Sequence, residues 1–361
     1  MTPSLQLDKI TLAQYRNYTV NTFLFPNQIT CITGKNGTGK TNLLDAVYYL
    51  CYTKSYFTSQ QQGIAQHTTD GFRLEGFFEK AKIHSKVACK WQAGKKEIFL
   101  NDAVVEKATD HIGKYSAVMI APDDIEVING GGELRRKWID SILGQSDLIY
   151  LEHLLLYQKV LLQRNAWLKL QVPGRQIDRG EIEFYDMQLV KAGTEIFKQR
   201  SAFLQIFLPV VNELYATLSS SAEIIDIQHS SDLYQKDFSR LIADGFDQDL
   251  RLQRTNRGIH RDDFQFQLDG QSLKQFGSQG QKKSFLFALK LAQFRYITDH
   301  LKHKPILLLD DVFEKLDQSR LTALLKMITH ESFGQVIITD THKERVQTAF
   351  GAGADLHFIE L

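Results

Sequence analysis

The chain has 361 residues, of which 43% are hydrophobic and 24% are charged, and its formal net charge is +1. This length is enough to bury a substantial core and form two domains, and the near-neutral balance excludes nucleic-acid binding through bulk charge alone. No segment has an apolar run near the length of a signal peptide or a membrane span, so we expect a cytoplasmic protein with no membrane partner.

The cysteines of the chain are Cys31, Cys51 and Cys89. Their odd number and unpaired spacing disfavour both a disulfide and a zinc site. We therefore predict buried free thiols.

The first informative element in chain order is a strand, a glycine-rich loop and a helix. Residues 29–32 are mostly apolar and β-branched and predict the strand, and apolar residues within 43–50 share one helical face. The loop, together with the residue after it, consists of Gly34, Lys35, Asn36, Gly37, Thr38, Gly39, Lys40, Thr41 and Asn42. Its G-x-x-x-x-G-K-T pattern stands in the order that a phosphate cradle requires.

The glycines of such a loop let backbone N–H groups converge on phosphate oxygens, and the helix N-terminus adds positive partial charge. We expect Lys40 to reach the β- and γ-phosphates of ATP and the Thr41 hydroxyl to ligate Mg²⁺. The alternative is a glycine-rich turn without a ligand, which the flanking strand and helix disfavour.

Alternating apolar and polar residues follow at 72–79, 83–91 and 97–105, with short polar turns between them. This alternation predicts an antiparallel sheet beside the nucleotide core. Residues 264–268, followed by the Asp-Gly pair at 269–270, predict a further hairpin.

Helical periodicity begins near Leu148, breaks at Pro173 and Gly174, and resumes from about Glu181 to about Pro209. Two helices of 20 to 30 residues would form an antiparallel arm about 30 to 45 Å long. We therefore expect a head built from residues 1–125 and 256–361, and a helical arm of residues 126–255.

A further polar loop consists of Ser278, Gln279, Gly280 and Gln281, and it precedes a predicted helix of about residues 281–300. A serine, a glycine and free N–H groups at a helix start can bind an anion. An ordinary capped helix start is the alternative for this loop taken by itself.

The apolar run 306–309 predicts a strand covered on both faces, and it ends in Asp310 and Asp311. Asp310 is the candidate carboxylate for the metal that accompanies the phosphate loop. Asp311 is the candidate catalytic residue that would orient or deprotonate the attacking water. An ordinary strand that ends in acidic residues is the alternative.

Any nucleic-acid contact would have to come from local basic clusters, because the net charge is small. They are Arg135-Arg136-Lys137, Lys282-Lys283, and the set Arg251, Arg254, Arg257 and Arg261 at near-helical spacing. Each cluster can instead be a solvated face, and the Arg135-Arg136 pair can instead brace the structure.

These motifs resemble the ABC-type ATPases and, more closely, the RecF family of bacterial recombination-mediator ATPases, which is related to the SMC heads. The matching motifs span residues 7 to 341. They are Arg16-Asn17-Tyr18, the phosphate loop continued by Asn42-Leu43-Leu44, Pro122-Asp123-Asp124, Arg135-Arg136, Tyr157-Gln158-Lys159-Val160, Gln163-Arg164-Asn165, His260-Arg261-Asp262-Asp263, Ser278-Gln279-Gly280-Gln281 and Asp310-Asp311-Val312.

The resemblance implies an α/β P-loop head of the ABC/SMC class with an antiparallel β lobe, a helical arm and weak, DNA-stimulated ATPase activity. It adds Arg16 and Asn17 to the nucleotide site. It also implies an ATP-dependent homodimer in which Ser278 and Gly280 of one chain contact the γ-phosphate held by Lys40 of the other. Implied partners are double-stranded DNA near single-strand gaps and junctions, and RecR and RecO in loading RecA.

The chain departs from the usual pattern at three places. The loop after the acidic pair reads Glu314-Lys315-Leu316-Asp317, in which only Asp317 matches with confidence. Asp311 stands where many ABC ATPases have glutamate, and its shorter side chain suggests slow hydrolysis. His342 is out of register with the switch histidine of transporters, and it is a weak candidate for a γ-phosphate contact.

Two other functions use the same nucleotide motifs. A transporter-coupling ATPase usually carries leucine-serine-glycine-glycine-glutamine at the signature and has no arm, and it would co-purify with membranes. A small-molecule P-loop kinase has no need of the Ser278 loop, and ATP would not dimerise it.

Overall fold

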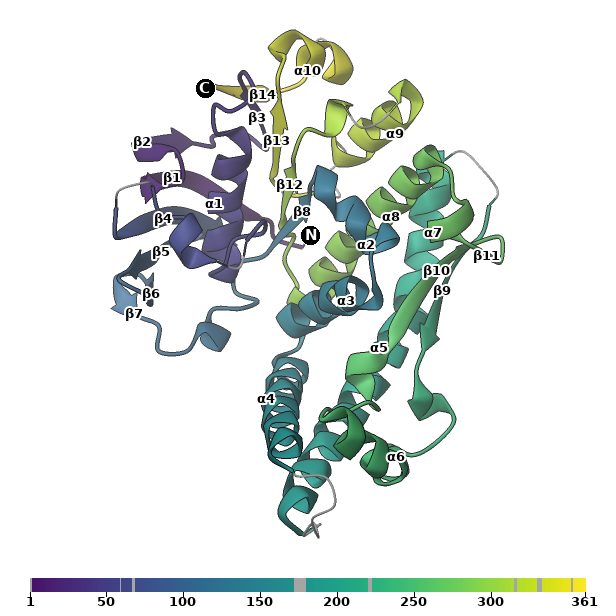
Figure 1. Cartoon of the computed structure of the whole chain (residues 1–361). Helices are drawn as coiled ribbons and strands as arrows, with labels where there is room; N and C mark the ends of the chain where they lie inside the picture. The colour runs from purple at the N-terminus through teal and green to yellow at the C-terminus, as the bar shows by residue number, and fades with distance from the viewer. Residues whose placement is uncertain are drawn as a thin grey trace. The chain divides into compact units, whose positions relative to one another are not determined.

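The computed structural model describes residues 2–58, 60–66, 69–171, 180–219, 223–314, 317–329, 333–351 and 353–361. The chain forms two compact units (Figure 1). Unit 1 contains Met1–Asp124, Thr217–Ser220 and Lys283–Leu361, and unit 2 contains Ile125–Ala216 and Ser221–Lys282. The sequence-based division assigned residues 256–282 to the head, whereas they belong to unit 2.

Unit 1 is built on a parallel sheet whose strands come from both ends of the chain. Their order is β14 (Leu356–Glu360), β3 (Ile29–Thr33), β13 (Val336–Asp340), β12 (Ile306–Leu309) and β8 (Ala117–Ile120). Neighbouring strands are all parallel. Each residue of β3, β8, β12 and β13 is buried, which explains why these strands are apolar or mostly apolar in sequence.

A second sheet, which is antiparallel, packs against this parallel sheet, and the two share an apolar core. Its order is β2 (Tyr18–Leu24), β1 (Leu5–Tyr15), β4 (Gly71–Lys80), β5 (Ile83–Gln92), β6 (Lys95–Leu100) and β7 (Ala103–Val104). The predicted strand at 97–105 is wrong in one respect, because it is two strands joined by a tight turn. Asn101 and Asp102 form that turn with φ of +49° and +65°, the backbone that a two-residue hairpin requires.

Within the part of the chain that the structure describes, helices complete unit 1. They are α1 (Lys40–Tyr52), α8 (Gln279–Leu301), whose first residues belong to unit 2, α9 (Gln318–Thr329) and α10 (Lys343–Phe350). Most residues of α1 and α8 are buried. Cys31, Cys51 and Cys89 are buried free thiols, so the cysteine prediction is confirmed.

Unit 2 combines helices with a small antiparallel sheet. The helices are α2 (Glu126–Asn129), α3 (Gly132–Ser146), α4 (Leu148–Leu170), α5 (Gly180–Ser219), α6 (Phe238–Leu252) and α7 (Leu273–Phe276). The sheet has the order β11 (Gln271–Ser272), β10 (Asp263–Leu268) and β9 (Ile225–Ser230). The β10–β11 hairpin is therefore confirmed, and its packing against β9 and α3 explains why residues 256–282 join this unit.

The two long helices differ from the prediction at one end. The predicted break at Pro173 and Gly174 lies outside the described residues. The second helix does not end near Pro209, because α5 continues through it to Ser219 and is about 60 Å long. Buried Phe207 and Val211 flank the proline, so core packing outweighs the hydrogen bond that its ring removes.

By length and composition alone, α5 could cross a membrane. The helix nevertheless buries the charged side chain of Arg200, which is 1% exposed and bound to two carboxylates of unit 2. This is the behaviour of a core helix that packs within a protein.

Candidate functional site

The phosphate loop follows β3 and runs directly into α1. The ammonium of Lys40 folds back over the loop and donates to the carbonyl oxygens of Gly34 at 2.8 Å and Lys35 at 3.1 Å. Only 5% of Lys40 is exposed. The loop therefore holds a cation at the N-terminus of α1, where backbone N–H groups also attract phosphate.

The last glycine of the loop is required by its surroundings. Gly39 has φ of +110°, and a Cβ added there would lie 2.6 Å from the Asn17 amide nitrogen and 2.9 Å from the Tyr18 hydroxyl. Asn17 Nδ2 donates to the Thr38 carbonyl at 2.9 Å, and its Oδ1 accepts from Asn42 at 2.8 Å. Asn17 and Asn42, both predicted nucleotide-site residues, thus hold the loop to the antiparallel sheet and to α1.

Arg16, the other residue predicted from the same segment, contacts a buried carboxylate behind the loop. Its guanidinium lies 3.2 Å from Asp45 on α1, and Asp45 also accepts from the Tyr15 hydroxyl at 2.9 Å and from Ser55 Oγ at 2.8 Å. The sequence analysis missed Asp45, although an aspartate on the apolar face of a predicted helix was an available signal. These contacts fix α1, and hence the loop, against the sheet.

The carboxyl end of β12 places Asp310 beside the loop. Both of its oxygens lie 3.0 Å from the Thr41 hydroxyl, and its Oδ1 accepts from the Thr339 hydroxyl at 2.7 Å. Burial, reinforced by the charge of Asp311, raises the pKa of the Asp310 carboxyl, while its hydrogen bonds act in the opposite sense. Thr339 on β13, the strand between β3 and β12, was not predicted.

Asp311 leaves the strand in the left-handed backbone region, with φ of +48°. Its N–H donates to the same Thr339 hydroxyl at 2.9 Å. Thr339 therefore binds the carboxylate of Asp310 and the backbone of Asp311.

The pair formed by Thr41 and Asp310 fits Mg²⁺. Magnesium binds hydroxyl and carboxylate oxygens together with phosphates and water, and here both oxygen donors converge next to the phosphate loop. The structure thus brings together the predicted loop lysine, the predicted metal ligands and the candidate water-orienting residue at one edge of the parallel sheet.

A buried ion pair that was not predicted lies at the end of β8, the other neighbour of β12. Lys290 of α8 is 3% exposed, and its ammonium lies 3.0 Å from Asp124 and 2.7 Å from the Tyr56 hydroxyl. Tyr56 also donates to Asp124, and the Ala121 N–H donates to Asp124 at 2.8 Å. This triad of Asp124, Lys290 and Tyr56 fixes α8 to the carboxyl edge of the sheet.

Two weaker candidates lie at helix starts. Asp317 accepts from the N–H of Arg320 at 3.0 Å and caps α9, while residues 315 and 316 lie outside the described residues. The backbone N–H of His342 donates to Asp340 at 2.7 Å. A phosphate contact by either side chain stays a prediction.

The loop at Ser278 belongs to unit 2 and begins α8. Ser278 Oγ accepts from the Gln281 N–H at 3.2 Å, and Gln281 Oε1 accepts from the Ser278 N–H at 2.7 Å. This reciprocal pair is a capping box, which the S-x-x-Q spacing signals. Ser278 and Gln279 remain exposed, and Gly280 is half-buried, so the loop is preformed and accessible.

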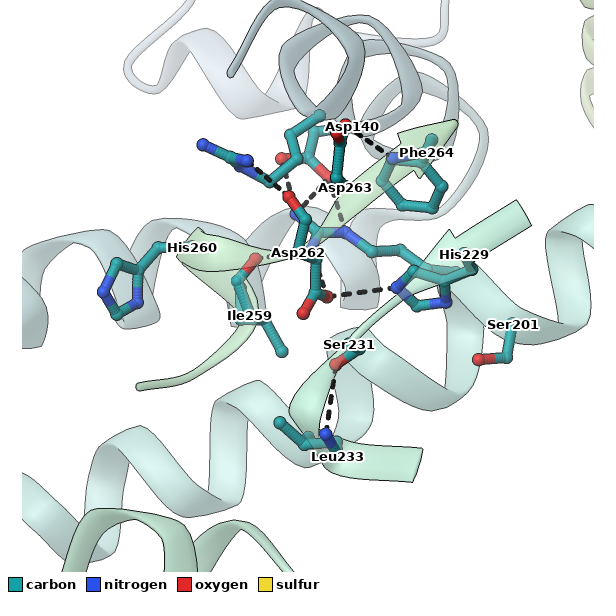
Figure 2. Close-up of polar contacts among 12 residues, drawn as sticks. Asp140, Ser201, His229, Ser231, Leu233, Ile259, His260, Asp262, Asp263 and Phe264 are labelled. Atoms are coloured by element: carbon teal, nitrogen blue, oxygen red, sulfur yellow. Dashed lines mark hydrogen bonds and ion pairs between the residues drawn. The ribbon is translucent and has the colours of Figure 1, made fainter. Parts of the chain in front are cut away.

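The segment His260-Arg261-Asp262-Asp263 builds the interior of unit 2. Arg200 of α5 contacts Asp262 at 3.1 Å and Asp140 of α3 at 2.9 Å, and it donates to the Ile259 carbonyl at 2.9 Å. His229 of β9 contacts Asp262 at 3.1 Å, and Figure 2 marks this contact with a dashed line. Through these contacts the motif joins α3, α5 and β9 within one unit.

The side chains of Arg135 and Arg136 bind groups in this interior of unit 2. Arg135 forms a two-pronged ion pair with Asp263 at 2.8 and 3.0 Å and donates to the Gly130 carbonyl at 3.0 Å. Arg136 donates to the Asp262 carbonyl. These contacts favour a bracing role for the pair over a role in DNA binding.

The four arginines at near-helical spacing do not share a helix. α6 ends at Leu252, because Gln253 adopts the left-handed conformation with φ of +52°. Arg251 lies in the last turn of α6, whereas Arg257 follows the helix and pairs with Asp232 at 2.8 Å. The four arginines therefore do not form one helical face, and a DNA contact by this cluster stays a prediction.

Comparison with known proteins gives consistent matches over nearly the whole chain. The family model of the RecF/RecN/SMC N terminal domain matches residues 6–354. The DNA replication and repair protein RecF of Flavobacterium johnsoniae is 40% identical over 95% of this chain and 96% of its own length. The RecF protein of Cytophaga hutchinsonii is 35% identical over 96% of this chain and 92% of its own length.

Solved structures also match this chain over nearly its whole length. The recombination mediator protein RecF of the RecFOR pathway, with ATP, has a TM-score of 0.88 and 28% identity, over 95% of this chain and 94% of that one. An SMC head bound to the C-winged helix domain of ScpA has a TM-score of 0.56 and 14% identity, over 98% of this chain and 94% of that one, a likeness of fold alone. The predicted fold class, an α/β P-loop head of the ABC/SMC type, is confirmed.

Proposed function

Since the chain belongs to the RecF family of DNA replication and repair proteins, we propose that it is an ATP-dependent DNA-binding protein of recombination, repair and replication. One observation carries this proposal within the molecule. Lys40, Thr41 and Asp310 converge at the carboxyl edge of a buried parallel sheet, which is the arrangement that binds and hydrolyses a nucleoside triphosphate.

In this site the loop from Gly34 to Asn42 wraps the phosphates, and Lys40 exchanges its carbonyl partners for phosphate oxygens. Asn17 and Arg16 hold the loop and α1 in place for that exchange. Mg²⁺, held by Thr41 and Asp310, neutralises phosphate charge when it is bound. Asp311 orients the attacking water, and its short side chain makes this a slow ATPase.

ATP joins two copies of the chain. The loop of Ser278, Gln279, Gly280 and Gln281 from one copy contacts the γ-phosphate on Lys40 of the other. Its exposure and its preformed, capped helix start support this role. In this proposal unit 1 is the ATPase head and unit 2 is the lever.

The assembled dimer binds double-stranded DNA next to single-strand gaps and junctions, and DNA stimulates its ATPase. It acts in the cytoplasm with RecO and RecR to load RecA. The solved RecF structures, which are named for the RecFOR pathway, support the choice of these partners. Hydrolysis then releases the DNA by separating the two copies.

The test is light scattering with and without ATP and Mg²⁺, followed by addition of duplex DNA. We expect ATP to double the mass and DNA affinity to rise with it. Lys40→Ala removes both effects, because the triphosphate loses its main cationic partner. The exposed Lys107→Ala is the matched control and keeps both. Normal ATP-driven dimerisation of Lys40→Ala would overturn the proposal.

A further inference from the structure

Helix α4 is apolar on two opposite faces, and only one of them is covered. The covered face packs Tyr150, Leu154, Tyr157, Val160 and Leu168 into unit 2. The opposite face exposes large apolar side chains, which we call the leucine face. Its members are Leu148 (53% exposed), Ile149 (63%), Leu155 (47%), Leu156 (37%) and Leu162 (71%).

The leucine face repeats every seven residues. Leu148, Leu155 and Leu162 form one row, and Ile149 and Leu156 form the row beside it. The two rows are offset by one residue, so they lie about 100° apart around the helix, on either side of a central strip. Large apolar side chains that gather along one exposed helix face mark a candidate interaction site.

Two opposite charges stand in the middle of the leucine face, also seven residues apart. Glu152 and Lys159 are both exposed and, among the described residues, neither has a hydrogen bond or ion pair. They lie at equal distances in sequence from the midpoint between Leu155 and Leu156. The face therefore has a positive and a negative site placed symmetrically about its centre.

From this symmetry we propose that the leucine face binds the leucine face of a second copy of the chain, with the two α4 helices antiparallel. A two-fold axis at Leu155 and Leu156 places Glu152 of each copy opposite Lys159 of the other. The same register places Ile149 opposite Leu162. A self-complementary patch of this kind is what a two-fold dimer requires.

The helix is held rigidly enough to present this surface. Asp147 caps its N-terminus by accepting from the Ile149 N–H at 2.8 Å. Near the other end, the buried Arg164 contacts Asp249 at 2.5 Å and Asp186 of α5 at 2.6 Å. Pairing therefore costs little ordering entropy.

This contact is separate from the dimer that ATP forms through the nucleotide site, and it needs no nucleotide. One helix pair buries less area than the roughly 1,600 Å² of a standard interface, so the association is weak, on the order of micromolar. It gives each copy a second place to bind another copy, so that ATP-linked pairs can join into longer assemblies.

Charge reversal tests the pairing without nucleotide, by sedimentation at micromolar chain concentration. Glu152→Lys and Lys159→Glu each turn two attractions into repulsions and raise the dimer Kd roughly tenfold. The double variant Glu152→Lys/Lys159→Glu restores the opposite charges and the wild-type Kd. A wild-type chain that stays monomeric, or a double variant that is not rescued, would overturn the proposal.

Cross-linking tests the orientation, because the native cysteines are all buried. Leu155→Cys lies at the axis and is captured by a short bismaleimide. Leu170→Cys, on the same helix and 78% exposed, lies about 40 Å from its counterpart in the antiparallel pair and is not captured. Capture of Leu170→Cys would mean parallel helices and would refute the proposed register. ATP-driven dimerisation of these variants, measured separately, shows whether the nucleotide site works.

Discussion

Replacing Thr339 with valine tests the arrangement of the acidic pair, because one hydroxyl serves both members. It donates to Asp310 Oδ1 at 2.7 Å and accepts from the Asp311 N–H at 2.9 Å, and Thr339 is fully buried. Valine keeps the branched shape that suits β13 but can make neither hydrogen bond. Thr339→Val therefore removes two polar contacts with little change in shape.

The expected cost follows from the two bonds. A hydrogen bond to a charged group contributes about 1.5–3 kcal/mol and a neutral one about 1 kcal/mol, so the loss is about 2–4 kcal/mol. For a unit of this size, that lowers the melting temperature by roughly 5–15 °C. The hydroxyl also opposes the rise in the pKa of Asp310, so its loss raises that pKa further and weakens Mg²⁺-dependent ATP binding.

Thermal unfolding and ATP titration with and without Mg²⁺ measure these effects. Thr339→Ser is the matched control, because it keeps the hydroxyl and loses only a methyl group. We expect serine to retain most of the Mg²⁺-dependent affinity that valine loses. If valine leaves both stability and affinity unchanged, or if serine is equally damaged, the hydroxyl does not organise the acidic pair.

Other variants test other parts of the structure. Asp311→Asn should keep ATP binding and prolong the dimer, whereas Asp310→Asn should weaken Mg²⁺-dependent binding; equal effects in nucleotide titrations would contradict the division of roles. Arg135→Met should lower the melting temperature by several degrees, because it leaves the Asp263 carboxylate without its ion-pair partner. The same variant should leave the salt dependence of DNA affinity unchanged. A flatter salt slope would instead mean that Arg135 contacts DNA. Burial lowers the pKa of His303 from 6.5 to about 4. As the pH falls, His303 is therefore protonated in the unfolded chain before it is protonated in the folded one. The free energy of unfolding consequently falls by about 2 kcal/mol between pH 7 and pH 5. In urea unfolding, His303→Gln should reduce this loss of stability, while His84→Gln, at an exposed position, should not. If the wild type and both variants have the same dependence of stability on pH, the buried His303 imidazole is not its cause.

The sequence predicted the parts of the site that are local in the chain. The phosphate loop, its strand and its helix are adjacent residues, so spacing alone identified Lys40 and Thr41. Asp310 followed from a buried apolar run with a carboxylate at its end. The capping box at Ser278 and Gln281 was also within reach, since its spacing signals it.

Other features depend on contacts that no local pattern carries. Thr339 reads as one more residue of a buried strand until β13 is placed between β3 and β12. Lys290 reads as a surface lysine on a helix, yet it meets Tyr56 across 234 residues of sequence. The prediction of where α5 ends was wrong for the same reason, because the local effect of Pro209 is weaker than the packing that surrounds it.

The order of strands in the parallel sheet of unit 1 also constrains how the chain folds during its synthesis. On the ribosome, β3 emerges early, but both of its neighbours, β13 and β14, lie within the final 26 residues of the sequence. Residues 125–282 can meanwhile fold first, because all of unit 2 lies within them. A chain released before β13 is synthesised would carry an intact phosphate loop on an unpaired strand. Competence to bind ATP would then report that β13 has been synthesised and has paired with β3.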